Sequence, residues 1–279
     1  MISLTTPQIA ALLQDTAFKQ TCSDCGYFSR PFRVNHEGQE LIVKTFLPVR
    51  SREIVGSIID NHNAYVARLC EIGINLPDTL INCLPQQGKQ QLVIIQQPFA
   101  EDEMVRGMIS KAALEEIEML CRLMFADAIL FANRTKAKGE IGFHPSLRNY
   151  AYSDGKLWYF DTFPPMLMDQ RSLNRMIIAM SPYGRLIKKI TPTRMINRVS
   201  NEYYYLPKMF IGIVGSCCRL RPELADEILS FSRNFATESE LIADTERKAI
   251  VELLKTPPHL SKLWRVWRRL SGNIGKPNV

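Results

Sequence analysis

Residues 144–165 read HPSLRNYAYSDGKLWYFDTFPP. Two runs rich in aromatic residues, Tyr150–Tyr152 and Lys156–Phe160, flank a Ser-Asp-Gly turn, which predicts a short β-hairpin. Asn149 immediately precedes the first strand and Asp161 immediately follows the second. Because the outer ends of two antiparallel strands lie side by side, the hairpin is expected to bring Asn149 and Asp161 together.

The chain before this hairpin alternates between strand-like and helical patterns. Residues 26–47 contain two apolar runs around a turn at Asn35-His36-Glu37-Gly38, which predicts a pair of strands. Helical spacing of apolar residues then predicts a helix over 51–72, ended by a glycine. Two further strand-like runs follow at Thr79–Leu84 and Gln91–Gln97.

The remaining chain is mostly helical in pattern. Apolar spacing predicts helices over 5–20 and 110–131, and most of the chain beyond Pro165 has the same character. A strand-rich N-terminal half joined to a helical C-terminal half predicts an α+β fold with two lobes. The expected parts are an N-terminal helix, an N-lobe, a hinge and a helical C-lobe, at residues 1–20, 21–98, 99–103 and 104–279.

Composition restricts the location of the protein. Of its 279 residues, 46% are hydrophobic and 23% are charged, which are ordinary values for a globular chain. No apolar stretch approaches the roughly 20 residues that span a membrane, and the N-terminus does not resemble a secretory signal. Seven scattered cysteines, an odd number, favour a reducing compartment. The protein is therefore expected to be soluble and cytoplasmic.

The charge predicts an anionic partner. The net charge is +7 and the isoelectric point is about 9.0, which suits a nucleotide, a nucleic acid or an acidic membrane surface. No nucleic-acid-binding motif is visible, so a nucleic acid is the least favoured of the three. The basic, aromatic segment 262–270 has helical spacing. It is expected either to lie on an anionic membrane or to dock on the C-lobe with its arginines outward.

Three polar residues carry the candidate chemistry. Lys44 lies in the predicted strand Leu41-Ile-Val-Lys44-Thr-Phe46, and Asn149 and Asp161 lie at the ends of the hairpin. Phosphoryl transfer depends mainly on positioning and on charge neutralisation. A carboxylate and an amide oxygen are hard ligands of the kind that Mg²⁺ prefers.

In this order along the chain, the three residues resemble the protein-kinase-like superfamily, in particular its aminoglycoside and choline phosphotransferases. The resemblance implies that Lys44 binds the α- and β-phosphates of ATP and that Asn149 and Asp161 hold Mg²⁺. It implies a two-lobed fold and an ATP- and Mg²⁺-dependent phosphotransferase that acts on a small or polar substrate. The identity of that substrate, a small molecule or a protein, stays open.

The sequence departs from the family pattern in three places. No glycine-rich loop precedes Lys44, and the predicted helix 51–72 has no obvious glutamate to pair with that lysine. His144 stands five residues before Asn149, where the family has its catalytic aspartate. His144 is either a general base, since imidazole titrates near neutral pH, or a buried structural histidine. The alternative function is accordingly a catalytically dead kinase-like protein that binds nucleotides or regulates a partner.

Overall fold

The computed structural model describes residues 2–14, 20–21, 29, 31–46, 48–49, 52–135, 140–180 and 203–258. The basic segment 262–270 lies outside the described residues. The helices are α1 (Thr6–Gln14), α2 (Arg52–Ile72), α3 (Val105–Ile109), α4 (Leu114–Arg134), α5 (Gln170–Met180), α8 (Leu206–Leu220), α9 (Ala225–Glu238) and α10 (Asp244–Leu253). The strands are β1 (Gln20–Thr21), β2 (Phe32–His36), β3 (Gln39–Thr45), β4 (Thr79–Gln86), β5 (Lys89–Gln96), β6 (Tyr150–Ser153) and β7 (Lys156–Tyr159). Short 3-10 helices are η1 (Glu101–Glu103), η2 (Leu147–Asn149) and η4 (Pro222–Leu224).

The main sheet is antiparallel, with the strand order β1-β2-β3-β5-β4. Its two hairpins and the separate β6–β7 hairpin turn through Glu37-Gly38, Gln87-Gly88 and Asp154-Gly155, all with positive φ. Two successive residues with positive φ match the right-handed twist of the flanking strands, and glycine adopts this conformation without steric cost. The predicted turns and strand pairs are confirmed.

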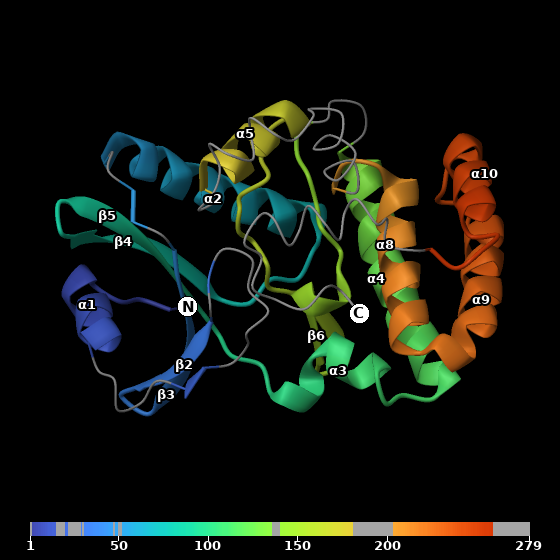
Figure 1. Cartoon of the computed structure of the whole chain (residues 1–279), viewed down its shortest axis with the longest axis horizontal. Helices are drawn as coiled ribbons and strands as arrows, with labels where there is room; N and C mark the ends of the chain where they lie inside the picture. The colour runs from blue at the N-terminus through green and yellow to red at the C-terminus, as the bar shows by residue number, and fades with distance from the viewer. Residues whose placement is uncertain are drawn as a thin grey trace.

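Alternate residues of β5 face opposite sides of this sheet. Val93 and Ile95 pack in a cluster with α1, whereas Leu92 and Ile94 pack in a cluster with α2. Figure 1 shows α1 and α2 on opposite faces of the sheet, with the helices α4, α8, α9 and α10 at the other end of the molecule. Because Val43 belongs to the α1 cluster, its neighbour Lys44 lies on the α2 face.

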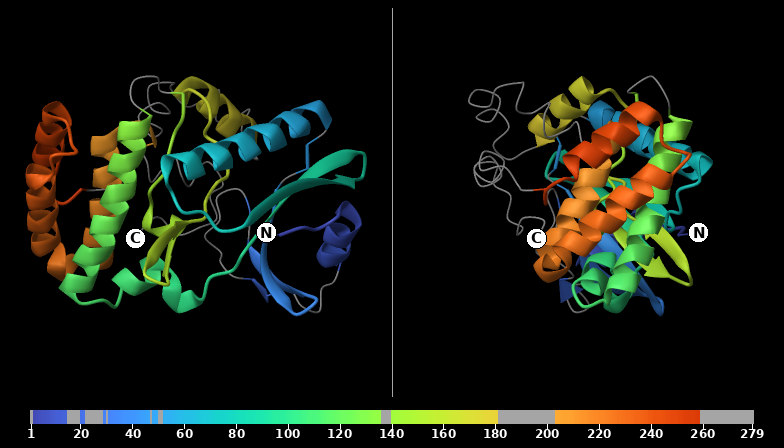
Figure 2. Two further views of the ribbon diagram at one scale, coloured as in Figure 1. Left: turned by 180° about the vertical axis from the view of Figure 1, so that it is seen from behind. Right: turned by 90° about the vertical axis from the view of Figure 1, so that its right-hand side faces the viewer.

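The helical end is built around α4. The ring of Phe125 in α4 stacks on that of Phe210 in α8 at a centroid distance of 4.2 Å, and Phe235 of α9 completes the aromatic contact. Figure 2 shows α4, α8, α9 and α10 packed side by side, with the β6–β7 hairpin next to α4. The fold is thus of the α+β class, as the sequence predicts.

Two predicted element boundaries are wrong, and one short helix was missed. Gln20 belongs to strand β1 and not to the N-terminal helix, because it pairs with Arg33 of β2. The helix predicted from residue 110 begins at Leu114. The short helix α3, just before it, was not predicted. In the sequence, the helical pattern of α3 continues into that of α4. Only the turn between them in the structure separates the two helices.

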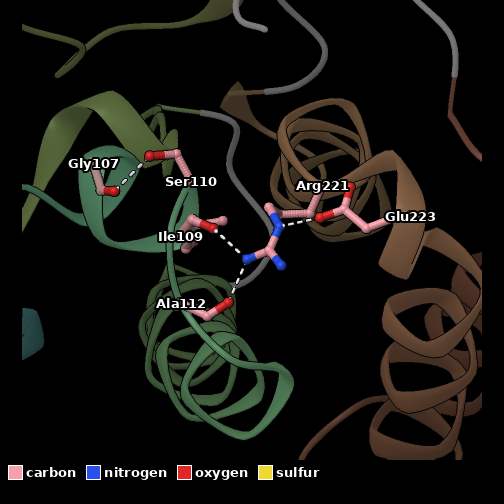
Figure 3. A network of polar contacts seen from close by, with 6 residues as sticks. All are labelled: Gly107, Ile109, Ser110, Ala112, Arg221 and Glu223. Carbon is pink, nitrogen blue, oxygen red and sulfur yellow. Dashed lines mark hydrogen bonds and ion pairs between the residues drawn. The ribbon is translucent and has the colours of Figure 1, made fainter.

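This turn is held by Arg221, which follows α8. The guanidinium donates hydrogen bonds to the carbonyl oxygens of Ile109 and Ala112, and its Nε lies 2.5 Å from a carboxylate oxygen of Glu223 (Figure 3). Ser110 Oγ closes the turn further by donating to the carbonyl oxygen of Gly107 at 2.7 Å. Arg221 therefore joins the α3–α4 turn to the α8–α9 turn.

We predict that Arg221→Met lowers the free energy of unfolding by about 2–3 kcal/mol, because it leaves two part-buried carbonyl groups without this donor. The matched control is Arg68→Met, which removes an exposed ion pair with Glu71 and should cost at most about 0.5 kcal/mol. Urea unfolding of both variants measures the difference. Equal losses would show that Arg221 is not a structural tie.

Candidate functional site

Lys44 of β3 reaches the segment that follows β7. Its Nζ donates a hydrogen bond to the carbonyl oxygen of Phe160 at 3.2 Å and lies 5.5 Å from the centroid of the Phe160 ring. Its charge also interacts with the carboxylate of Asp161. Two residues that the sequence predicts for the site are thereby brought together from distant parts of the chain.

Burial controls the ionisation of this pair. Desolvation lowers the pKa of Lys44 and the charge of Asp161 opposes that shift. Desolvation likewise raises the pKa of Asp161, and Lys44 opposes it. Burial therefore disfavours the charged form of each residue, and the opposite charge is the main group that stabilises it. An added cation near Asp161 or an added anion near Lys44 would be attracted to the site.

The hairpin places the backbone of Asn149 next to that of Phe160, the residue before Asp161. The backbone carbonyl oxygen of Asn149 accepts a hydrogen bond from the backbone N–H of Phe160 at 3.0 Å. This bond holds Asn149 against the residue that precedes Asp161. The side chain is buried, and its Nδ2 donates to the carbonyl oxygen of His144 at 3.0 Å. The same Nδ2 lies 3.4 Å from His144 Nδ1.

His144 is half-buried, and its ring meets the edge of the Tyr203 ring at a centroid distance of 4.7 Å. Burial lowers the pKa of His144 to about 4, so the ring is neutral at pH 7. Where Nδ1 accepts the hydrogen bond from Asn149, the hydrogen of the neutral ring is on Nε2. Proton uptake in that tautomer takes place at Nδ1.

Sequence reasoning missed His62, which α2 contributes to the site. It is 1% exposed, and its Nε2 lies 2.9 Å from Thr162 Oγ1, next to Asp161. Burial, reinforced by the charge of Lys44, lowers the pKa of His62 to about 4. A signal was present: His62 lies four residues after Ile58 and three before Tyr65, on the apolar stripe of the helix.

We predict that His62 makes the protein less stable in acid. Because the unfolded chain takes up a proton on this ring near pH 6.5 and the folded one only near pH 4, acidification through this window favours unfolding. His62→Gln keeps a donor for Thr162 but does not titrate. Between pH 7 and pH 4.5 the wild type should lose about 2 kcal/mol more than this variant in urea unfolding. Equal losses of unfolding free energy in the wild type and in His62→Gln would contradict the lowered pKa of His62.

Two other buried groups were also missed. Gln96, the last residue of β5, is 2% exposed and donates from Nε2 to the carbonyl oxygen of Phe160 at 2.9 Å. Tyr65 of α2 donates to the carbonyl oxygen of Gly142 at 3.0 Å and so joins α2 to the loop that carries His144. A glutamine at the end of a strand gave no sign of burial in the sequence.

The magnesium ligands that the sequence predicts, Asn149 and Asp161, stay a prediction. No group of three or more His, Cys, Asp and Glu residues that could hold a metal occurs in the part of the chain that the structure describes. Asp161 and Asn149 offer one carboxylate and one amide oxygen, and Mg²⁺ is commonly held by so few protein ligands together with phosphate oxygens and water.

Two cavities border other parts of the fold. One, of about 550 Å³, lies between α1 and the sheet, where Ala10, Leu13 and Phe32 line it. The other, of about 460 Å³, is lined by Ile54 and Ile58 of α2 and by Met176 of α5, among others. Neither lining includes Lys44, Asn149 or Asp161.

Within the described residues, no helix is both long and apolar enough to cross a membrane. A family model described as a family of unknown function (DUF6206) matches residues 8–275 of the chain. A comparison with curated proteins gives no match.

Proposed function

Because the chain belongs to the DUF6206 family, whose function is unknown, we propose a function from the site itself: an ATP- and Mg²⁺-dependent phosphotransferase that acts on a small or polar substrate. The observation that carries the proposal is the hydrogen bond from Lys44 Nζ to the carbonyl oxygen of Phe160 at 3.2 Å, which holds the amine next to the residue that precedes Asp161. Phosphoryl transfer requires such a cation and such a metal ligand side by side.

The order of the elements supports this proposal. A helix, α2, stands between β3 and β4, and the sheet has the order β1-β2-β3-β5-β4. A long helix and a small hairpin that ends at Asp161 follow. We infer a protein-kinase-like arrangement of two lobes, in which the sheet with α1 and α2 forms the N-lobe and the helices from α3 onward form most of the C-lobe.

In this proposal each residue has one task. Lys44 exchanges its bond to the Phe160 carbonyl for the phosphate oxygens of ATP. Asp161 and Asn149 hold Mg²⁺, which neutralises phosphate charge when it is bound. His144 accepts the proton of the acceptor hydroxyl. Burial lowers the pKa of His144 to about 4, so the ring is neutral at pH 7 and can accept a proton.

A nucleotide-binding regulatory protein without catalysis is the second candidate, and the state of His144 favours it. Asn149 Nδ2 lies 3.4 Å from Nδ1 of the ring, and where Nδ1 accepts a hydrogen bond from it, His144 takes up a proton only after that contact breaks or the hydrogen changes place. Either function suits the cytoplasm, because the cysteines of the described residues are all free, as in a reducing compartment. They are Cys70, Cys83, Cys121, Cys217 and Cys218.

A thermal-shift titration of the wild-type protein with ATP tests both candidates. ATP with Mg²⁺ at millimolar concentration should raise the unfolding temperature, because a ligand that binds only the folded state adds about 2.7 kcal/mol at 100 times its Kd. ATP with EDTA should have a much smaller effect. If ATP with Mg²⁺ gives no shift at 5 mM, where binding needs only a Kd of about 1 mM to be seen, both candidates fail.

A further inference from the structure

The carbonyl oxygen of Phe160 accepts two side-chain hydrogen bonds. One comes from Lys44 Nζ at 3.2 Å, and the other comes from Gln96 Nε2 at 2.9 Å. The amide of Gln96 is fixed by a second acceptor, Thr79 Oγ1, at 3.0 Å. Because Thr79 and Gln96 are paired across β4 and β5, this donor is held by the sheet and not by the segment it binds.

The two donors are not equivalent. Lys44 is the residue that must leave the carbonyl if it is to bind phosphate, whereas Gln96 is buried and is also hydrogen-bonded to Thr79. A part-buried carbonyl group left without a donor is costly, while one that keeps a donor is not. With Gln96 in place, Lys44 can move away and the Phe160 carbonyl remains hydrogen-bonded.

We propose that Gln96 is a positioning residue that keeps the Phe160 carbonyl hydrogen-bonded while Lys44 is released to an incoming phosphate. This inference rests on the proposed function. It assigns to Gln96 an effect on ligand affinity through Lys44, without any contact between Gln96 and the ligand. It also fixes the peptide bond next to Asp161, so the metal ligand keeps its place when the lysine moves.

Gln96→Met tests this role, because methionine has nearly the same volume and no donor. In the variant, release of Lys44 leaves the Phe160 carbonyl without either donor. The affinity for ATP with Mg²⁺, measured by calorimetry, should fall about tenfold, the size expected for an unsatisfied part-buried acceptor. Acylation of the Lys44 amine by acetic anhydride, followed by mass spectrometry of the ligand-free protein, should slow by a similar factor, because acylation also requires the amine to leave the carbonyl.

Gln91→Met is the matched control. Gln91 lies on the same strand and also donates from Nε2 to a carbonyl, that of Phe46 at 3.4 Å, but it does not bind Phe160. Both measurements should be unchanged in this variant. Circular dichroism checks the fold, and Gln96→Leu replaces Gln96→Met if the latter does not fold.

The two measurements separate the inference from the proposed function. If the wild type does not bind ATP, the proposed function fails, while slower acylation in Gln96→Met alone still supports the coupling between Gln96 and Lys44. If acylation is as fast in Gln96→Met as in Gln91→Met, the inference is wrong whatever ATP does. It is also wrong if the wild type binds ATP and Gln96→Met binds it equally well.

Discussion

Asp161→Ala and Lys44→Ala should each abolish the stabilisation of the folded protein by ATP and Mg²⁺. Removal of Asp161 takes away the only carboxylate proposed to bind the metal, and removal of Lys44 takes away the cation proposed to bind the α- and β-phosphates. The expected loss is the whole ligand-induced shift, equivalent to at least about 2–3 kcal/mol at saturating ATP. Differential scanning fluorimetry with and without ATP measures it.

Each single variant leaves the other buried charge without its main partner, so the fold itself needs a control. Lys44→Met/Asp161→Asn removes both charges and should fold without binding ATP. Lys156→Ala, which changes an exposed lysine in the β7 strand, should bind ATP like the wild type. Retention of the full ATP shift in the double variant would exclude this pair as the nucleotide site.

The second large effect concerns His144. If the protein transfers phosphate, His144→Ala should lower the rate on the order of 10²-fold or more, the usual cost of losing a general base. His144→Asp should retain much of the activity or exceed it, because it restores the aspartate that the resembled family has at this position. Steady-state rates of phosphate transfer at saturating ATP give the comparison.

The pH dependence of the phosphate-transfer rate follows from the lowered pKa of His144. A base with a pKa of about 4 stays deprotonated from pH 8 down to about pH 5, so the wild-type rate should change little in that range and fall below it. A rate that already halves near pH 6.5 would show an unshifted histidine. Equal rates for the wild type and His144→Ala would make His144 structural. If the protein binds ATP but transfers phosphate to none of a broad panel of hydroxyl and amine acceptors, the enzyme is excluded and the second candidate, a regulatory protein that binds nucleotides, is supported.

Local patterns in the sequence were enough to predict the elements around the site. The hairpin that carries Asn149 and Asp161, the strand of Lys44 and the helix over residues 52–72 all occur within a few residues of their predicted bounds. Apolar periodicity and turn glycines determine these features, because both act between residues that are close in sequence. The errors at Gln20 and before Leu114 arise where a contact from elsewhere ends the element: pairing with β2 in one case, the Arg221 bonds in the other.

The sequence by itself therefore determined most of the strands and helices, the α+β class, and the short hairpin that places the backbone of Asn149 next to that of Phe160. Only the tertiary structure decided which side chains surround them. Lys44 and Phe160 are 116 residues apart, and His62 and Thr162 are 100 apart. No periodic pattern specifies such a pair, since it depends on how the sheet, α2 and the hairpin pack. Gln96 belongs to the site for the same reason: its burial comes from the Phe160 segment packed against the end of β5 and not from its own strand.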